Sequence, residues 1–186
     1  MTLTQSVLPA VKKIKEFEAL LESETDYIIL LESRLGLLRK LVKIGQKAGK
    51  KVFVHVDLIQ GLKADDYGME YIGQEVKPDG VISTRAHVIQ QAKKYHLVSV
   101  QRLFLIDSQA IEHNVKLIQK TAPDFVEVLP GVLPGMIKEI KEHIGIPVIA
   151  GGLIRTKEEV DQALASGASA VSTSRSELWR FNSENT

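Results

Sequence analysis

Two clusters of glycine and hydroxyl residues near the end of the chain have the composition of a phosphate-binding site. Gly151 and Gly152 follow one apolar run, and Ser172, Thr173 and Ser174 end the next. Glycine lets backbone N–H groups approach phosphate oxygens closely, and hydroxyls add further donors. A helix starting near Ser174 would add the positive end of its dipole. In the plainer interpretation, the glycines only make a turn and Ser174 only caps a helix.

A second set of candidate residues could bind the rest of a small polar ligand: His55, Asp57, Arg85 and Glu127. Glu127 interrupts an apolar run, where a carboxylate needs either a partner or a wet cavity, and Arg85 is its expected complement. Strand alternation puts His55 and Asp57 on the same side, which we expect to face the interior. Carboxylates beside an arginine suit a ligand with hydroxyls and an anionic group. In the plainer interpretation, His55 is a satisfied core residue, and Asp57 and Glu127 are exposed or cap a following helix.

Catalytic uses of these side chains stay open at this point. A metal-dependent phosphodiester hydrolase could draw its magnesium or calcium ligands from Glu32, His55, Asp57, Asp107 and Glu127, although no tight ligand motif joins them. Asp57 or Glu127 could also act as the base of an isomerase. A Schiff-base aldolase is poorly supported, because Lys12 and Lys13 are the only lysines near a strand end.

Eight short apolar, β-branched runs precede these polar residues and are predicted to be strands. They cover residues 6–11, 26–32, 50–57, 79–85, 98–107, 123–130, 146–152 and 169–174. Amphipathic segments of helical period lie between them, such as 33–49, 108–122 and 156–168. Strands alternating with helices specify a covered parallel sheet, and eight such units favour a compact (β/α)8 barrel of the TIM type.

In such a barrel the carboxyl ends of all strands meet at one mouth, where functional residues gather. The loops after strands seven and eight form the recurrent phosphate site of this fold, and both glycine and hydroxyl clusters fall there. Thr156 and Glu159 match a helix capping box, and Gly49 and Gly167 lie where helices should end. The long connection over residues 58–78 is expected on the same functional face.

The composition describes one ordinary globular domain. The chain has 186 residues, no cysteine and a formal net charge of +1, so it has no thiolate metal site and no overall attraction for polyanions. We predict a single barrel domain over residues 1–179 and a polar tail over 180–186. Neither a signal peptide nor a membrane span is evident, and a cytoplasmic protein is expected.

Several long blocks of the sequence resemble the glycerol uptake operon antiterminator regulatory proteins. They cover residues 51–72, 78–94, 100–111, 123–140 and 146–174, and include "IPVIAGGLIRTKEEVDQALASGASAVSTS". The resemblance implies a regulator that responds to glycerol 3-phosphate, binds leader mRNA and prevents premature transcription termination. It implies no catalysis. We therefore expect no catalytic residues, no cofactor and no bound metal, with glycerol 3-phosphate as effector.

The residues fit this implication as a set of ligand contacts. Gly151, Gly152, Ser172, Thr173 and Ser174 would hold the phosphate, and His55, Asp57, Arg85 and Glu127 the polyol end. The expected partners are leader mRNA, glycerol 3-phosphate and further copies of the chain in a homo-oligomer; membrane association is not expected. RNA binding rests on the resemblance, because the basic clusters are interleaved with apolar positions as on an ordinary solvated helix face. The alternative is a barrel enzyme acting on a phosphorylated polyol or a glycerophosphodiester.

Overall fold

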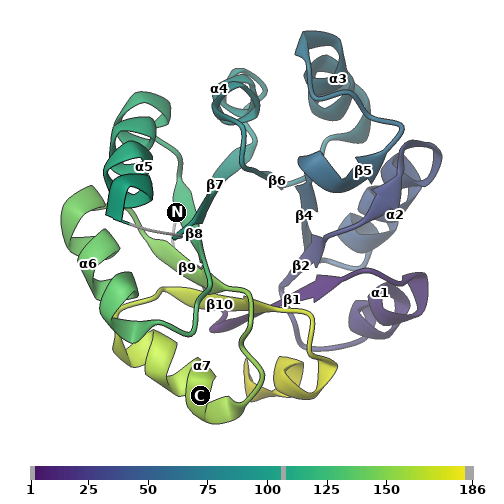
Figure 1. Cartoon of the computed structure of the whole chain (residues 1–186). Helices are drawn as coiled ribbons and strands as arrows, with labels where there is room; N and C mark the ends of the chain where they lie inside the picture. The colour runs from purple at the N-terminus through teal and green to yellow at the C-terminus, as the bar shows by residue number, and fades with distance from the viewer. Residues whose placement is uncertain (1–2, 106–107, 183–186) are drawn as a thin grey trace.

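Eight parallel strands close into one barrel within residues 3–105 and 108–182, the part of the chain that the computed structural model describes (Figure 1). They are β1 (Val7–Val11), β2 (Tyr27–Leu30), β4 (Lys51–His55), β6 (Gly80–Ser83), β7 (Val98–Phe104), β8 (Phe125–Leu129), β9 (Val148–Gly151) and β10 (Ala170–Thr173). The first and last of these strands pair, with Leu8 opposite Ser172. The predicted (β/α)8 barrel is confirmed.

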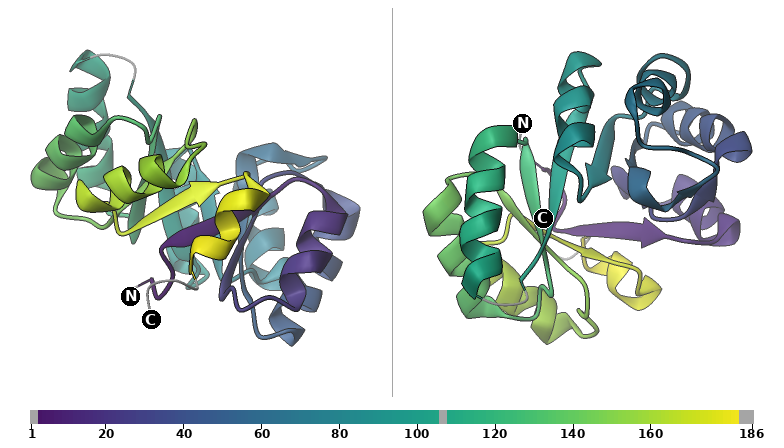
Figure 2. Two further views of the ribbon diagram at one scale, coloured as in Figure 1. Left: turned by 90° about the horizontal axis from the view of Figure 1, so that it is seen from below. Right: turned by 45° about the horizontal axis from the view of Figure 1, so that its top comes forward.

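Helices surround the barrel on its outer side (Figures 1 and 2). They are α1 (Ile14–Leu21), α2 (Leu35–Lys47), α3 (Asp66–Tyr71), α4 (Ala86–Lys94), α5 (Ser108–Thr121), α6 (Pro134–Ile144) and α7 (Lys157–Ala165). The eighth unit ends in a 3-10 helix, η3 (Ser176–Asn182), in place of an α-helix. None of the helices described is both long and apolar enough to cross a bilayer.

Alternation along the strands divides the apolar side chains between two cores. Phe53, Phe125 and Ile149 belong to a cluster inside the barrel, whereas Val52 and Val126 belong to the larger cluster between strands and helices. Inside, the rings of Tyr27 and Phe53 meet edge to face with centroids 5.8 Å apart. Because apolar side chains fill the middle of the barrel, polar chemistry is confined to the ends of the strands.

The predicted helix boundaries are confirmed where capping residues specify them. The Thr156 hydroxyl accepts a hydrogen bond from the Glu159 N–H at 3.3 Å, and the Glu159 carboxylate accepts one from the Thr156 N–H at 3.2 Å. Gly49 and Gly167, just after α2 and α7, have φ of 78° and 98°, a region where glycine avoids the Cβ clash.

Two regions are more structured than the sequence analysis anticipated. The long connection after β4 contains a 3-10 turn, η1 (Val56–Leu58), then β5 (Ile59–Gln60), α3 and a π-helical turn, η2 (Ile72–Val76). Within it, β5 pairs with a second short strand, β3 (Ser33–Arg34), which follows β2. At the other end of the chain η3 runs past Trp179 into the predicted tail as far as Asn182, and the domain division there stays a prediction.

Two glycines of α2 should respond oppositely to alanine. A Cβ on Gly36 would meet nothing within 4 Å, whereas a Cβ on Gly45 would lie 2.5 Å from Cγ2 of Val52 on β4. We expect Gly36→Ala to raise the free energy of unfolding by about 0.5–1 kcal/mol through helix propensity. Gly45→Ala should lower it by about 1–3 kcal/mol, because overpacking outweighs that gain. Urea denaturation measures both, and stabilisation by both variants would contradict the packing described.

Candidate functional site

A cavity of about 250 Å³ opens at the carboxyl ends of the strands, where the sequence predicted a phosphate site. Gly152, Ser172, Thr173 and Ser174 line it, together with Glu127 from the predicted polyol set. Four cationic residues also line it: Lys12, Arg102, Arg155 and Arg175. The structure thus brings most of the predicted phosphate set and one residue of the polyol set to one cavity, and adds a group of positive charges.

A buried hydrogen-bonded network forms the inner wall of this cavity. The Glu127 side chain on β8 is 1% exposed. Its Oε2 lies 2.6 Å from Nε of Arg102 on the neighbouring strand β7, and its Oε1 accepts a hydrogen bond of 2.5 Å from the Ser172 hydroxyl on β10. The strand register sets Arg102 directly beside Glu127. Both carboxylate oxygens therefore have partners, which compensates for burial of the charge.

Gly151 makes room for this network and does not itself line the cavity. A Cβ at this position would lie 2.7 Å from the Ser172 hydroxyl oxygen and 2.8 Å from Oε1 of Glu127. A side chain at residue 151 would therefore push the serine and the carboxylate apart. Gly152 comes next, with a φ of 74°, and lines the cavity through its backbone.

Positive charge dominates the outer part of the cavity. Arg155 and Arg175 are exposed, and neither has a carboxylate partner among residues 3–105 and 108–182. Lys12 is paired with Glu32 at 3.1 Å on the rim. With Glu127 already neutralised by Arg102, the open side of the cavity can receive an anion.

The end of β10 differs from the prediction. The helix expected near Ser174 begins at Ser176 and is a seven-residue 3-10 helix, so the expected α-helix dipole is missing. The Thr173 hydroxyl donates to the carbonyl of Ile154 at 3.3 Å, and the Thr173 carbonyl accepts from the Trp179 indole N–H at 2.9 Å. These bonds fix the strand end and leave Ser174 exposed at the cavity.

Asp57 and Arg85 lie apart from the cavity, at the ends of β4 and β6. Asp57 accepts hydrogen bonds from the Ser83 hydroxyl at 2.7 Å and from the Thr84 N–H and hydroxyl at 2.8 Å each. Burial alone would raise the pKa of Asp57, but the bonds from Thr84 and Ser83 outweigh it, and the pKa is lowered. Arg85 lies 3.7 Å from Asp57. Arg85 was therefore the wrong partner for Glu127.

His55 lies inside the barrel and is held without hydrogen bonds. It is 2% exposed, and neither ring nitrogen has a hydrogen-bond partner within the described structure. Burial and the positive charge of Arg102 lower its pKa to about 4, against the opposing effects of Asp57 and Glu127. The imidazole is therefore neutral at pH 7. It does not share a strand face with Asp57 as expected, because the chain leaves β4 at His55 and Asp57 lies in η1.

The carboxylates considered as metal ligands are not assembled into a metal centre. In the residues with described positions, no three His, Asp or Glu side chains come close enough to hold an ion. Asp107, which was part of that set, lies outside the described residues. Arg102 was not among the predicted site residues. It is two residues after Val100 in the run 98–107, so strand alternation puts both side chains on the inner face, and this spacing could have identified it.

The neutral His55 gives the fold a specific sensitivity to acid. An unfolded histidine titrates near pH 6.5, so below this pH the unfolded chain binds a proton that the folded chain does not accept until about pH 4. Stability from this source is complete above pH 6.5 and is lost as the pH falls towards 4, by up to about 3 kcal/mol. His55→Leu should remove this loss, as measured by urea denaturation at pH 7 and pH 4.5. The exposed His113→Gln is the control, and an unchanged pH dependence in His55→Leu would refute the assignment.

A family model and one curated relative match nearly the whole chain. The model of the family "Glycerol-3-phosphate responsive antiterminator" matches residues 7–179. Uncharacterized protein YgcP of Escherichia coli (strain K12) is 31% identical over 173 residues, which are 93% of this chain and 91% of YgcP.

Solved structures give the same result. A glycerol uptake operon antiterminator regulatory protein from Listeria monocytogenes is 46% identical, with a TM-score of 0.93 over 97% of this chain and 99% of that one. An antiterminator-related protein from Thermotoga maritima is 31% identical, with a TM-score of 0.84 over 96% and 99%. An aldolase, QR15, is only 16% identical, with a TM-score of 0.70 over 89% and 88%, and shares the barrel fold alone. The chain belongs to the glycerol-3-phosphate responsive antiterminator family.

Proposed function

We propose that the protein binds glycerol 3-phosphate in the cavity at the strand ends and, in response, binds leader mRNA of glycerol-utilisation genes to prevent premature termination. The observation that carries the ligand assignment is the convergence of Arg155, Arg175 and Lys12 on a hollow whose inner wall is Glu127 and Arg102. The family membership carries the assignment of RNA.

The chemistry of the cavity matches the two ends of this ligand. A phosphate carries up to two negative charges, which the guanidinium groups of Arg155 and Arg175 can bind in bidentate fashion, with the backbone at Gly152 and the Ser174 hydroxyl as further donors. Each oxygen of Glu127 retains a second lone pair that can accept from a polyol hydroxyl. In this proposal Asp57 and Arg85 support the end of β6, outside direct contact with the ligand.

The proposal is for a sensor without catalysis. The carboxylate at the cavity, Glu127, is already bonded to Arg102 and Ser172, and is thereby poorly suited to act as a base. His55 is neutral but is not among the residues that line the cavity. These features favour recognition of the ligand over its turnover.

Calorimetry with glycerol 3-phosphate tests the ligand site. We expect saturable binding that glycerol does not reproduce, and a 10- to 100-fold weaker affinity for Arg175→Gln, because one charge-assisted contact is worth about 1.5–3 kcal/mol. The matched control is Arg180→Gln, which removes an exposed arginine of η3 that does not line the cavity. Equal losses in both variants would contradict the site.

The same samples test catalysis. Glycerol 3-phosphate and a glycerophosphodiester, each incubated with the protein and Mg²⁺, should be recovered unchanged by phosphorus NMR. Product that disappears in Glu127→Gln would establish the enzyme alternative.

RNA binding should depend on occupancy of the cavity. In gel shifts with the leader transcript of the glycerol uptake operon, we expect glycerol 3-phosphate to strengthen binding by at least about tenfold, a coupling of about 1.4 kcal/mol. Ser174→Asp places a carboxylate where the phosphate would bind and should abolish the response to ligand while leaving ligand-free RNA binding intact. Identical affinities with and without ligand in the wild-type protein would refute ligand gating.

A further inference from the structure

We propose that single-stranded RNA binds along the exposed basic face of α2 and in the apolar groove between α2 and α1. This inference rests on the proposed RNA-binding function and deepens it by assigning the surface.

Positive charge is concentrated in one part of the chain. Residues 33–56 contain seven cationic residues and no carboxylate, whereas the whole chain has a net charge of only +1. The seven are Arg34, Arg39, Lys40, Lys43, Lys47, Lys50 and Lys51. The remaining residues therefore carry a net negative charge, and residues 33–56 form the segment that favours a polyanion most.

Three of these lysines form a row that is free to contact a partner. Lys40, Lys43 and Lys47 are spaced three and four residues apart on α2, which sets them on one face of the helix over about 10 Å. All three are exposed and have no ion-pair partner in the described parts of the chain. By contrast, Arg39, one turn before Lys43 on the same helix, is paired with Glu75 at 3.3 Å.

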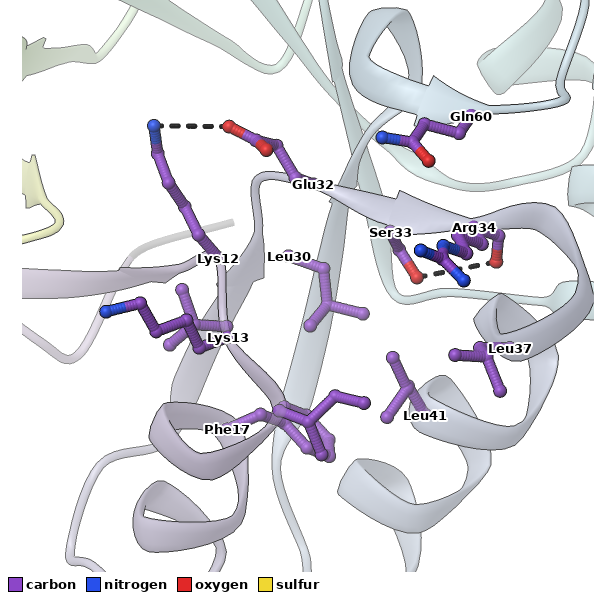
Figure 3. A pocket seen from close by; sticks show the side chains of 12 residues that line it. Lys12, Lys13, Phe17, Leu30, Glu32, Ser33, Arg34, Leu37, Leu41 and Gln60 are labelled. Carbon is purple, nitrogen blue, oxygen red and sulfur yellow. Dashed lines mark hydrogen bonds and ion pairs between the residues drawn. The ribbon is translucent and has the colours of Figure 1, made fainter.

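The groove beside this row has an apolar floor and a polar rim (Figure 3). Its volume is about 400 Å³, and Phe17, Leu30 and Leu41 form the floor. Ile14 on α1 and Leu37 on α2 are 49% and 40% exposed along its walls. The rim carries polar and charged side chains, among them the Lys12–Glu32 ion pair; the others are Lys13, Ser33, Arg34 and Gln60.

This combination favours a single nucleic-acid strand over a membrane surface. A bilayer binds helices whose apolar side chains project outward along a whole face. Here the apolar floor is recessed between two helices, and Ile14 and Leu37 are the partly exposed apolar residues of the walls. Lys40, Lys43 and Lys47 are not among the residues that line the groove. A single strand alternates phosphates with unstacked bases whose faces are apolar. The phosphates would contact the lysine row, and a base would enter the groove between Ile14 and Leu37.

Fluorescence anisotropy with a labelled single-stranded RNA of about 20 nucleotides tests the lysine row in the full-length protein. The triple variant combines Lys40→Gln, Lys43→Gln and Lys47→Gln. We expect its affinity for the RNA to fall at least tenfold. The slope of log K against log salt should become shallower by about 2, since each single-strand phosphate contact contributes about 0.7. The charge-matched control is Lys93→Gln, Lys94→Gln, Lys120→Gln, three exposed lysines on α4 and α5, which should change affinity less than threefold.

A second pair of variants tests the groove. Leu37→Glu puts a carboxylate on its wall and should weaken RNA binding at least tenfold, whereas Leu133→Glu, at a leucine of similar exposure near α6, should not. Thermal melting and glycerol 3-phosphate binding of each variant establish that it is folded.

The outcomes separate this inference from the proposed function. If the wild-type protein binds neither the RNA oligomer nor the leader transcript, the RNA function itself fails. If it binds RNA and both triple variants bind equally, only the surface assignment fails. If the α2 triple variant binds RNA like the wild-type protein but no longer binds phosphatidylglycerol vesicles, the surface binds a membrane and not RNA.

Discussion

The carboxylate of Glu127, buried inside the mouth of the barrel, sets the main constraint on this structure. Removing one partner of such a buried pair typically costs about 3–5 kcal/mol, so Arg102 and Ser172 must both stay in place. They lie on β7 and β10, so the network joins β7, β8 and β10 and passes across β9, which lies between β8 and β10. It also explains why β9 ends in Gly151. The inner wall of the cavity is thus built before any ligand arrives.

The fold could be predicted from the sequence, because the alternation of apolar strands and amphipathic helices is a local pattern that repeats along the chain. All eight predicted runs contain a strand of the barrel, since each is mainly apolar and β-branched and is separated from the next by an amphipathic segment. The ends were less accurate: the run 98–107 forms β7 only as far as Phe104. The short β3–β5 pair was missed, because two-residue strands have no periodicity and depend on a contact between distant loops.

The candidate site was readable only in part, because its geometry depends on neighbours across the barrel. Alternation along a strand predicts which face of the sheet a side chain lies on. The order and register of the strands decide that Arg102, and not Arg85, lies beside Glu127. His55 and Asp57 do not share a strand face, because the chain turns into the 3-10 helix η1 directly after His55. No residue type in the sequence indicates this turn. Arg155 and Arg175 lie in turns after strands, where side-chain direction follows no simple period.

Lys12 lines both the cavity at the strand ends and the groove between α1 and α2, with Glu32 as its partner on the rim. One ammonium group is therefore common to two hollows that no other cationic residue shares among those described. Charge entering either hollow changes the electrostatic surroundings of that ammonium and hence of the other hollow. By thermodynamic reciprocity, any effect of one occupant on the affinity of the second equals the effect of the second on the first. A single barrel domain can thus couple binding in the cavity to binding in the groove through the side chain of Lys12, without a movement of domains.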